Sequence, residues 1–426
     1  MPAEQAAAEA EGRRLPWWRN ILLFLAVLGP GLITASVDND AGGITTYSLA
    51  GSRYGYDLLW TLIPITVALI VVQEMSARMG VVTGKGLADL IRENFGVKVT
   101  FWISVALIVA NLGNVIAEFA GVAASLQIFG VPVWLSVPAA AVGVWLLVLK
   151  GSYRSVEKFF LVASAFYLVY PVSLAFSKPD WMEVARATAL PRFHADSQYV
   201  GMLIGMVGTT IAPWMQFYLQ SAVVEKGIKV EHYRFSRMDV IAGCIVTDLV
   251  AFAIVVACGA TLYKAGVQVE TAGQAALALE PLAGRYASWL FSFGLLNASF
   301  FAAAILPLST AYYVCEAFGW ESGVDKKYGE ARQFYWLYTS ILVVGALVVL
   351  WPNLPLVRIM LVSQIVNGVL LPFILVFMLL LINRTKIMGE WRNGRFFNAV
   401  AWGTTFIMIG LTAWLVVSGI RDLVAS

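Results

Sequence analysis

The chain has 426 residues, of which 60% are hydrophobic and 13% charged, and its formal net charge is +3. Soluble domains carry about a quarter charged residues, so this composition excludes a large soluble protein and indicates a membrane protein with several spans. The small net charge gives no reason to expect a nucleic-acid partner. Three cysteines in apolar segments and two histidines in polar loops indicate neither a disulfide framework nor the usual transition-metal sites.

Residues 1–20 are polar, and we expect them to form a disordered cytoplasmic N-terminus. They do not resemble a cleavable signal, because the apolar run that follows is too long. A bilayer core of about 30 Å needs about 20 apolar residues per helix, and the rest of the chain then divides into eleven spans. In chain order the predicted spans are 21–51, 57–80, 99–126, 132–150, 156–177, 199–226, 239–263, 285–318, 332–352, 355–383 and 396–420.

The basic residues predict the orientation. Cytoplasmic loops carry an excess of Lys and Arg. Placing the N-terminus in the cytoplasm puts most of the 29 basic residues of this chain in cytoplasmic loops. With eleven spans the C-terminus then lies outside. We therefore predict a multi-pass protein of the plasma membrane.

Two of the predicted spans are interrupted. The first contains the polar stretch VDNDAGGITT at 37–46, and the sixth has glycines that lead to Pro213. Proline removes a backbone donor and clashes with the preceding turn, so the helix is expected to unwind there. Interruptions at matching positions of two five-helix halves are typical of inverted repeats with a binding site between them. We predict repeats at 21–177 and 199–383, followed by an additional helix at 396–420.

Several stretches resemble the Nramp family of divalent-metal transporters. GPGLITASVDNDAGGITT at 29–46 is similar to the family's first helix, in which Gly-Pro-Gly is followed at the same distance by Asp-Pro-Gly-Asn. QEMSARMGVVTGKGLADL at 73–90 resembles the segment after the second helix, and VGTTIAPW at 207–214 resembles the helix 6 motif. Ser363, Gln364 and the stretch 371–373 resemble helix 10. The resemblance covers the chain from about residue 20. It implies an all-α LeuT-type fold: two inverted five-helix repeats and an eleventh helix, with helices 1 and 6 discontinuous.

The departures from the family pattern concern the site itself. Asp40 takes the place of the family's metal-binding Asp, whereas Gly43 stands where the family has Asn. Met-Pro-His of helix 6 is Ala212-Pro213-Trp214 here. A thioether helps to select transition metals, and Ala212 offers only its carbonyl. Asn111 and Asn114 replace an Asp and a Glu that resemble a proton route, and amides cannot titrate.

These departures resemble those of the prokaryotic Nramp-related magnesium transporters. Mg²⁺ is a hard ion that dehydrates reluctantly, and it suits oxygen ligands and a roomier site. The resemblance implies uptake of Mg²⁺, and also of Mn²⁺, without proton coupling, from a mid-membrane site between unwound helices 1 and 6. The predicted metal ligands are Asp40, Gly43, Thr209, Ala212 and Gln364. The residues predicted to surround the ion or line its path are Asp38, Asn39, Asn111, Asn114, Glu118, Trp214 and Asn367.

Structural roles stay open for some of these residues. Asp38 and Asn39 either act on the ion or pair with polar neighbours. Glu118 is a pathway residue or half of a structural ion pair, and Asp248 in the seventh span allows the same two interpretations. Gln364 reaches the ion or, like Asn367 one turn further, serves as a packing amide.

Two other functions stay open. The first is a proton-coupled Mn²⁺ or Fe²⁺ transporter of the Nramp type. The second is an organic-solute symporter of the same fold, although Asp40 would repel a substrate carboxylate. We expect no enzymatic activity and no cofactor. The expected partners are the transported divalent ion and the lipid bilayer, and the chain is expected to be a monomer.

Overall fold

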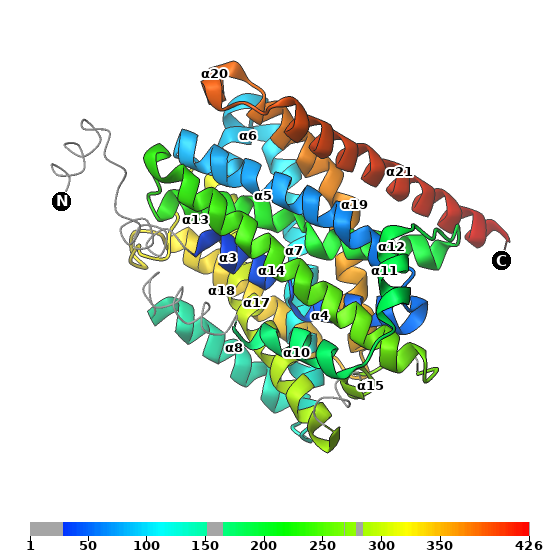
Figure 1. The fold of residues 1–426 in the computed structure, drawn as a ribbon. Coiled ribbons are helices and arrows are strands. Elements are labelled where there is room, and N and C mark those ends of the chain that lie inside the picture. The colour runs from blue at the N-terminus through cyan, green and yellow to red at the C-terminus, as the bar shows by residue number, and fades with distance from the viewer. Residues whose placement is uncertain (1–28, 151–164, 268, 278–283, 426) are drawn as a thin grey trace, which may run out of the picture.

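The computed structural model describes residues 29–150, 165–267, 269–277 and 284–425. Within these ranges every regular element is a helix (Figure 1). The predicted disordered segment 1–20 lies outside the described residues, as do the beginnings of the first and fifth predicted spans.

The main helices are α3 (Pro30–Val37), α4 (Ala41–Tyr54), α5 (Leu62–Thr83), α6 (Leu87–Phe95), α7 (Val97–Gln127), α8 (Val133–Lys150), α10 (Val169–Phe176), α11 (Trp181–Ala189), α12 (Ser197–Thr210), α13 (Pro213–Glu225), α14 (Tyr233–Cys258), α15 (Ala272–Ala276), α17 (Ala287–Phe318), α18 (Arg332–Val349), α19 (Leu356–Ile382), α20 (Thr385–Met388) and α21 (Arg395–Ala425).

Eight helical stretches in the described part of the chain are long and apolar enough to cross a membrane. They contain α5, α7, α12 with α13, α14, α17, α18, α19 and α21. The remaining predicted spans correspond to the broken pair α3 and α4, to the shorter apolar helix α8 and to α10. Each of the eleven predicted spans therefore contains at least one helix.

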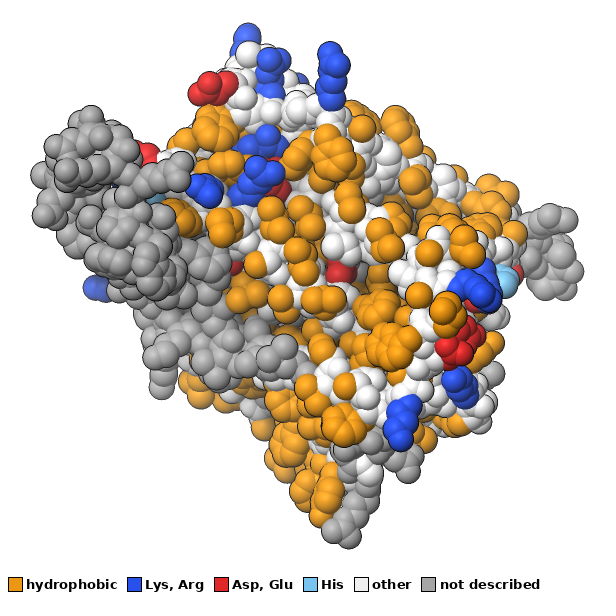
Figure 2. Space-filling view, in the orientation of Figure 1, with side chains coloured by type: hydrophobic (Ala, Val, Ile, Leu, Met, Phe, Trp, Pro, Cys, Tyr) orange, Lys and Arg blue, Asp and Glu red, His pale blue; other side chains and the backbone are white. Residues whose placement is uncertain are grey.

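The molecular surface fits a bilayer. Figure 2 shows hydrophobic side chains over most of the visible face, while Lys and Arg side chains gather toward its ends. Large apolar side chains such as Trp102, Trp134 and Ile407 are well exposed. Apolar patches of this extent are rare on soluble monomers, whereas lipid covers them in a membrane protein.

Both predicted interruptions are present. Helix α3 ends at Val37 and α4 begins at Ala41, while α12 ends at Thr210 and α13 begins at Pro213. Proline forces the preceding residue out of the helical region, and Ala212 is extended with φ −66° and ψ 139°. Asp40 is likewise extended, with φ −70° and ψ −176°.

The two interruptions lie deep in the molecule. Helix α14 packs along α3 and α4, α12 packs along α19, and α7 contacts both α17 and α19. Helices α8 and α21 lie at opposite edges of the molecule in Figure 1. Residues 37–52 are all buried. The polar residues of the first interruption are therefore enclosed by helices and do not face lipid.

The stretch 73–90 joins the end of α5 to α6 and anchors this end of the bundle. Arg78 pairs with Glu74 at 3.1 Å and donates to the carbonyls of Trp391 and Arg392 at 3.1 and 3.3 Å. A guanidinium can make several such bonds from one position because its donors form a planar fork. The stretch 73–90 therefore links α5 to the segment before α21.

Candidate cation site

The start of α4 is surrounded by carboxylates. Asp40 caps the helix, because its Oδ1 accepts a hydrogen bond from the Gly43 backbone N at 2.6 Å. Glu118, from α7, accepts from the Ala41 N at 3.2 Å through Oε2. Both side chains are buried. The free N–H groups and the positive end of the helix dipole favour negative groups at this place.

Gly43 marks the point where oxygens from both interruptions meet. A Cβ atom at this position would lie 2.4 Å from the Asp38 carbonyl oxygen, 3.2 Å from Thr209 Oγ1 and 3.4 Å from Asp40 Oδ1. The sequence predicts that the missing side chain enlarges the site. The structure differs, because the interrupted backbone folds the Asp38 carbonyl into that space. Gly43 thus brings in an additional oxygen and leaves less room than predicted.

The helix 6 side contributes mainly through Thr209. In a continuous helix its carbonyl would accept from the N–H of residue 213, and Pro213 has none. The side-chain Oγ1 of Thr209 is buried and has no hydrogen-bond partner among the described residues. The Ala212 carbonyl already accepts hydrogen bonds within the protein. One comes from the Met215 backbone N at 3.1 Å, and the other comes from the Gln216 side-chain N at 2.8 Å when that amide is oriented to satisfy its neighbours.

Gln364 approaches the site from α19. A Cβ on Gly42 would lie only 1.8 Å from Gln364 Nε2, so the amide lies directly against the start of α4. Its Oε1 accepts from Asn367 Nδ2 at 2.9 Å, while Nε2 is buried and has no partner in the described part of the chain. Gln364 therefore lies next to the start of α4 and is also hydrogen-bonded to Asn367.

The predicted amides form a continuous chain away from the site. Asn367 and Asn114 exchange hydrogen bonds of 2.9 and 3.2 Å, and Asn114 donates to Asn111 Oδ1 at 3.4 Å. Asn111 in turn donates to the Leu306 carbonyl at 2.7 Å and to Thr310 Oγ1 at 2.6 Å. The chain joins α19, α7 and α17, and every side chain in it is neutral.

The remaining predicted residues have different surroundings. Asn39 Nδ2 donates to the Thr247 carbonyl at 3.5 Å. Trp214 is buried, its ring lies 6.3 Å from that of Tyr218, and its carbonyl accepts from Ser309 Oγ at 3.2 Å. Trp214 therefore packs inside the helix bundle. Glu118 has no cationic partner among the described ion pairs, so the structural ion pair left open for it is not formed there.

Two contacts were not anticipated from the sequence. Asp239 of α14 caps α3, accepting from the Gly31 N at 2.7 Å and the Leu32 N at 3.1 Å. The hydroxyls of Tyr47 on α4 and Thr210 on α12 are hydrogen-bonded to each other at 2.7 Å. In the sequence, only the position of Asp239 at the start of an apolar span could have indicated the contact with α3. Together these bonds position the two broken helices.

The donor set consists of oxygens. In the part of the chain that the structure describes, no three Asp, Glu, His or Cys side chains come together as a metal-ligand group. A cation at this place would be bound by one carboxylate together with carbonyl, hydroxyl and amide oxygens. Such hard donors suit Mg²⁺, Ca²⁺ and Mn²⁺ better than soft metals.

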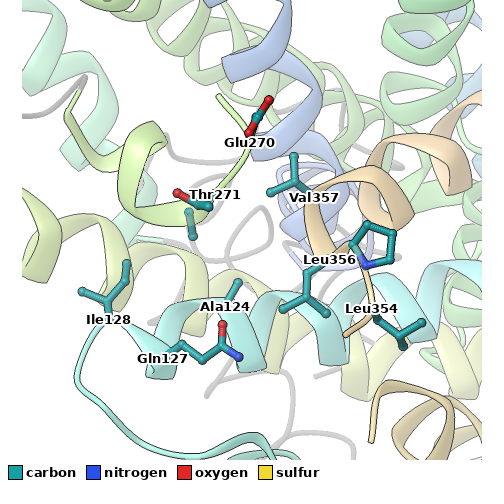
Figure 3. A pocket seen from close by; sticks show the side chains of 10 residues that line it. Ala124, Gln127, Ile128, Glu270, Thr271, Leu354, Leu356 and Val357 are labelled. Carbon is teal, nitrogen blue, oxygen red and sulfur yellow. The ribbon is translucent and has the colours of Figure 1, made fainter. Parts of the chain in front are cut away.

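A cavity of about 340 Å³ lies near one end of the same helices. Figure 3 shows Gln127 at the end of α7 and Ile128 directly after it, Leu356 and Val357 of α19, and Glu270 before α15 around it. The residues of α7 and α19 that line the cavity are about two helical turns along the chain from Glu118 and Gln364, respectively. It is therefore a candidate approach to the site from this side.

Comparison with known proteins identifies the family. The family profile described as Nramp, natural resistance-associated macrophage protein-like, matches residues 31–418. The chain belongs to the Nramp family. Among its curated Nramp relatives, the divalent metal cation transporter MntH of Bacillus subtilis is 26% identical over 99% of this chain and 98% of its own length. MntH of Deinococcus radiodurans is 29% identical, covering 96% and 93%.

Solved structures show the same fold. A manganese transporter from Eremococcus coleocola matches this Nramp chain with a TM-score of 0.77 at 22% identity, covering 95% of this chain and 88% of that one. Mhp1, a nucleobase-cation-symport-1 family transporter, matches with a TM-score of 0.56 at 13% identity, covering 92% and 93%. The predicted LeuT-type fold is confirmed.

Proposed function

We propose that this Nramp protein transports divalent metal cations, with Mg²⁺ as the preferred ion and Mn²⁺ as a second substrate, without proton coupling. The observation that carries the proposal is the all-oxygen set around Gly43, made by Asp38, Asp40 and Thr209. The names of the MntH relatives and of the manganese transporter support divalent cations as the substrate class.

The preference for Mg²⁺ follows from ligand chemistry. A site that selects Mn²⁺ or Fe²⁺ benefits from a soft ligand such as a thioether, and Ala212 has none. Asp40 is the carboxylate of the set and the other donors are neutral oxygens. An ion that keeps several of its waters can bind such oxygens directly or through water, as Mg²⁺ commonly does.

The amide chain is the observation that supports transport without proton coupling in this proposal. Asn111, Asn114, Asn367 and Gln364 cannot gain or lose a proton at physiological pH. A membrane potential favours cation entry by about 2.3 kcal/mol per charge per 100 mV, which is about 4.6 kcal/mol for a divalent ion. The electrical gradient is therefore sufficient to drive uptake without protons.

The topology belongs to the same proposal. We infer that α3 to α10 and α12 to α19 form the two inverted repeats, with α21 added after them. The protein would lie in the plasma membrane with its N-terminus in the cytoplasm and its C-terminus outside. Ions would approach from the cavity next to Glu270, whose carboxylate attracts cations.

The decisive test is uptake into proteoliposomes that contain a luminal pH reporter. With an inside-negative potential, we expect Mg²⁺ and Mn²⁺ to enter while the luminal pH stays constant. Acidification that accompanies Mn²⁺ uptake would instead establish the proton-coupled alternative, for which Glu118 beside the site is the available acid. Current that needs an organic solute and no divalent ion would establish the symporter.

Selectivity can be tested at Ala212. Replacing Ala212 with Met adds a thioether at the helix 6 interruption, and we expect the Mn²⁺ to Mg²⁺ uptake ratio to rise several-fold. The matched control is Ala212→Leu, which has a similar volume and no sulfur. The ratio is measured as competition between the two ions in proteoliposomes. An equal shift in both variants would mean that size, and not the ligand atom, sets the ratio.

A further inference from the structure

A second group of buried acids lies beside the candidate site. Both carboxyl oxygens of Asp38 and both of Asp248 lack a hydrogen-bond partner among the described residues, and both side chains are at least 95% buried. Asp38 follows the end of α3, and Asp248 lies within α14, which packs along α3 and α4. Neither carboxyl group is among the oxygens that converge on Gly43, where Asp38 contributes only its backbone carbonyl.

The two carboxyls share their surroundings. Asp38 and Asp248 lie within electrostatic range of each other, and Thr247, next to Asp248, donates its hydroxyl to the Ala35 carbonyl of α3. The neighbouring residues are also in contact, because Asn39 Nδ2 donates to the Thr247 carbonyl at 3.5 Å. The interruption of helix 1 therefore brings Asp38 to the face of α14 that carries Asp248.

Further oxygens accompany the pair. Asn39 Oδ1 is buried and lacks a donor within the described residues. Thr66 of α5 lies beside Asp248, and its Oγ1 donates to the Leu62 carbonyl at 2.7 Å. A bound cation would meet the lone pairs of this hydroxyl while its hydrogen stays on the Leu62 carbonyl. The group thus offers oxygens from three segments of the chain: the break between α3 and α4, α5 and α14.

The charges in this region are unbalanced. Asp38, Asp40, Glu118 and Asp248 are all buried, and none belongs to an ion pair of the described residues. Two of them, Asp40 and Glu118, accept backbone hydrogen bonds at the start of α4, whereas the carboxyl oxygens of Asp38 and Asp248 have no such partner among the described residues. A cation would supply the partner that this second pair of buried acids lacks.

We propose that Asp38 and Asp248, with the Asn39 side-chain oxygen and the Thr66 hydroxyl, form a second cation site for a hard divalent ion next to the transport site. Carboxylate, amide and hydroxyl oxygens are the donors that Mg²⁺ and Mn²⁺ take in proteins. An ion there neutralises the pair and repels the ion at Asp40, which assists its release. The inference rests on the proposed function only in treating Asp40 as the ligand of the transported ion.

The test counts and locates bound Mn²⁺. In the purified full chain, titration followed by the electron paramagnetic resonance signal of free Mn²⁺ is expected to give two bound ions per chain. Asp248→Asn, an isosteric change that removes one charge, is expected to leave one, and Asp40→Asn is also expected to leave one. In Mn²⁺-soaked crystals, anomalous scattering is expected to show one peak near Gly43 and a second between Asp38 and Asp248.

The control is Asp196→Asn. Asp196 caps α12 through a 2.8 Å bond from the Tyr199 N, away from both groups, and this variant should bind two ions. One ion per chain in the unmodified protein, or two in Asp248→Asn, would overturn the second site. If Asp248→Asn does not fold, Asp38→Asn serves the same purpose. Loss of an ion in Asp248→Asn but not in Asp40→Asn would keep the second site and contradict the assignment of Asp40.

Discussion

Replacing Asp40 with Asn is expected to lower divalent-cation uptake about 30-fold or more while the protein still folds. The variant keeps the size of the side chain and an oxygen that can accept from the Gly43 N, so the cap of α4 is retained. It removes the charge that faces the ion. Losing one partner of a buried charge pair costs about 2–5 kcal/mol, which corresponds to the stated reduction or more. Uptake of Mg²⁺ and Mn²⁺ into proteoliposomes measures it.

The comparison needs two further variants. Asp40→Ala should abolish uptake and also weaken the helix start by about 1 kcal/mol, because the cap is lost. Asp196→Asn repeats the change at a cap of α12 outside the site and should transport normally. Elution as a single monodisperse species checks folding in each case. Undiminished Mg²⁺ flux in Asp40→Asn would refute the assignment of Asp40 as a ligand.

The positions of the helices and their breaks could be predicted from the sequence, because they depend on local chemistry. Apolar runs of span length predict membrane helices. Pro213 cannot donate to the Thr209 carbonyl, so the sixth helix must open there. The acids at 38 and 40 are poor material for a helix in lipid, and they coincide with the first break.

The contacts of the site could not be predicted in the same way, because they join residues far apart in the chain. Asn114 and Asn367 are 253 residues apart, and no pattern along the sequence pairs them. Asp38 illustrates a second limit. The sequence points to the Asp38 side chain as the group that acts on the ion. In the structure its backbone carbonyl fills the space beside Gly43, and the position of that carbonyl depends on the torsion angles of the break between α3 and α4. Proximity of Asp38 to Asp248 likewise requires the packing of α14.

Gly43 has a specific role in this arrangement, and it does not concern backbone conformation. Its φ is not positive, so an alanine could adopt the same helical geometry. What excludes a side chain is the Asp38 carbonyl, 2.4 Å from the place of a Cβ. Restoring the Asn of the family pattern by one substitution therefore meets the same obstacle, and Gly43→Asn should be at least as harmful as Gly43→Ala, even when it is combined with Ala212→Met.

Gly43→Ala is accordingly expected to lower divalent-cation flux about tenfold or more, although alanine favours a helix by about 1 kcal/mol over glycine. The Asp38 carbonyl or the start of α4 must move, and either movement separates the oxygens that converge there. The matched control is Gly201→Ala on α12, where the nearest atom to a Cβ, Leu415 Cδ1, lies 3.9 Å away. That variant should keep its flux and gain thermal stability. Flux at the unmodified level in Gly43→Ala would mean that the Asp38 carbonyl is not part of the ion's path.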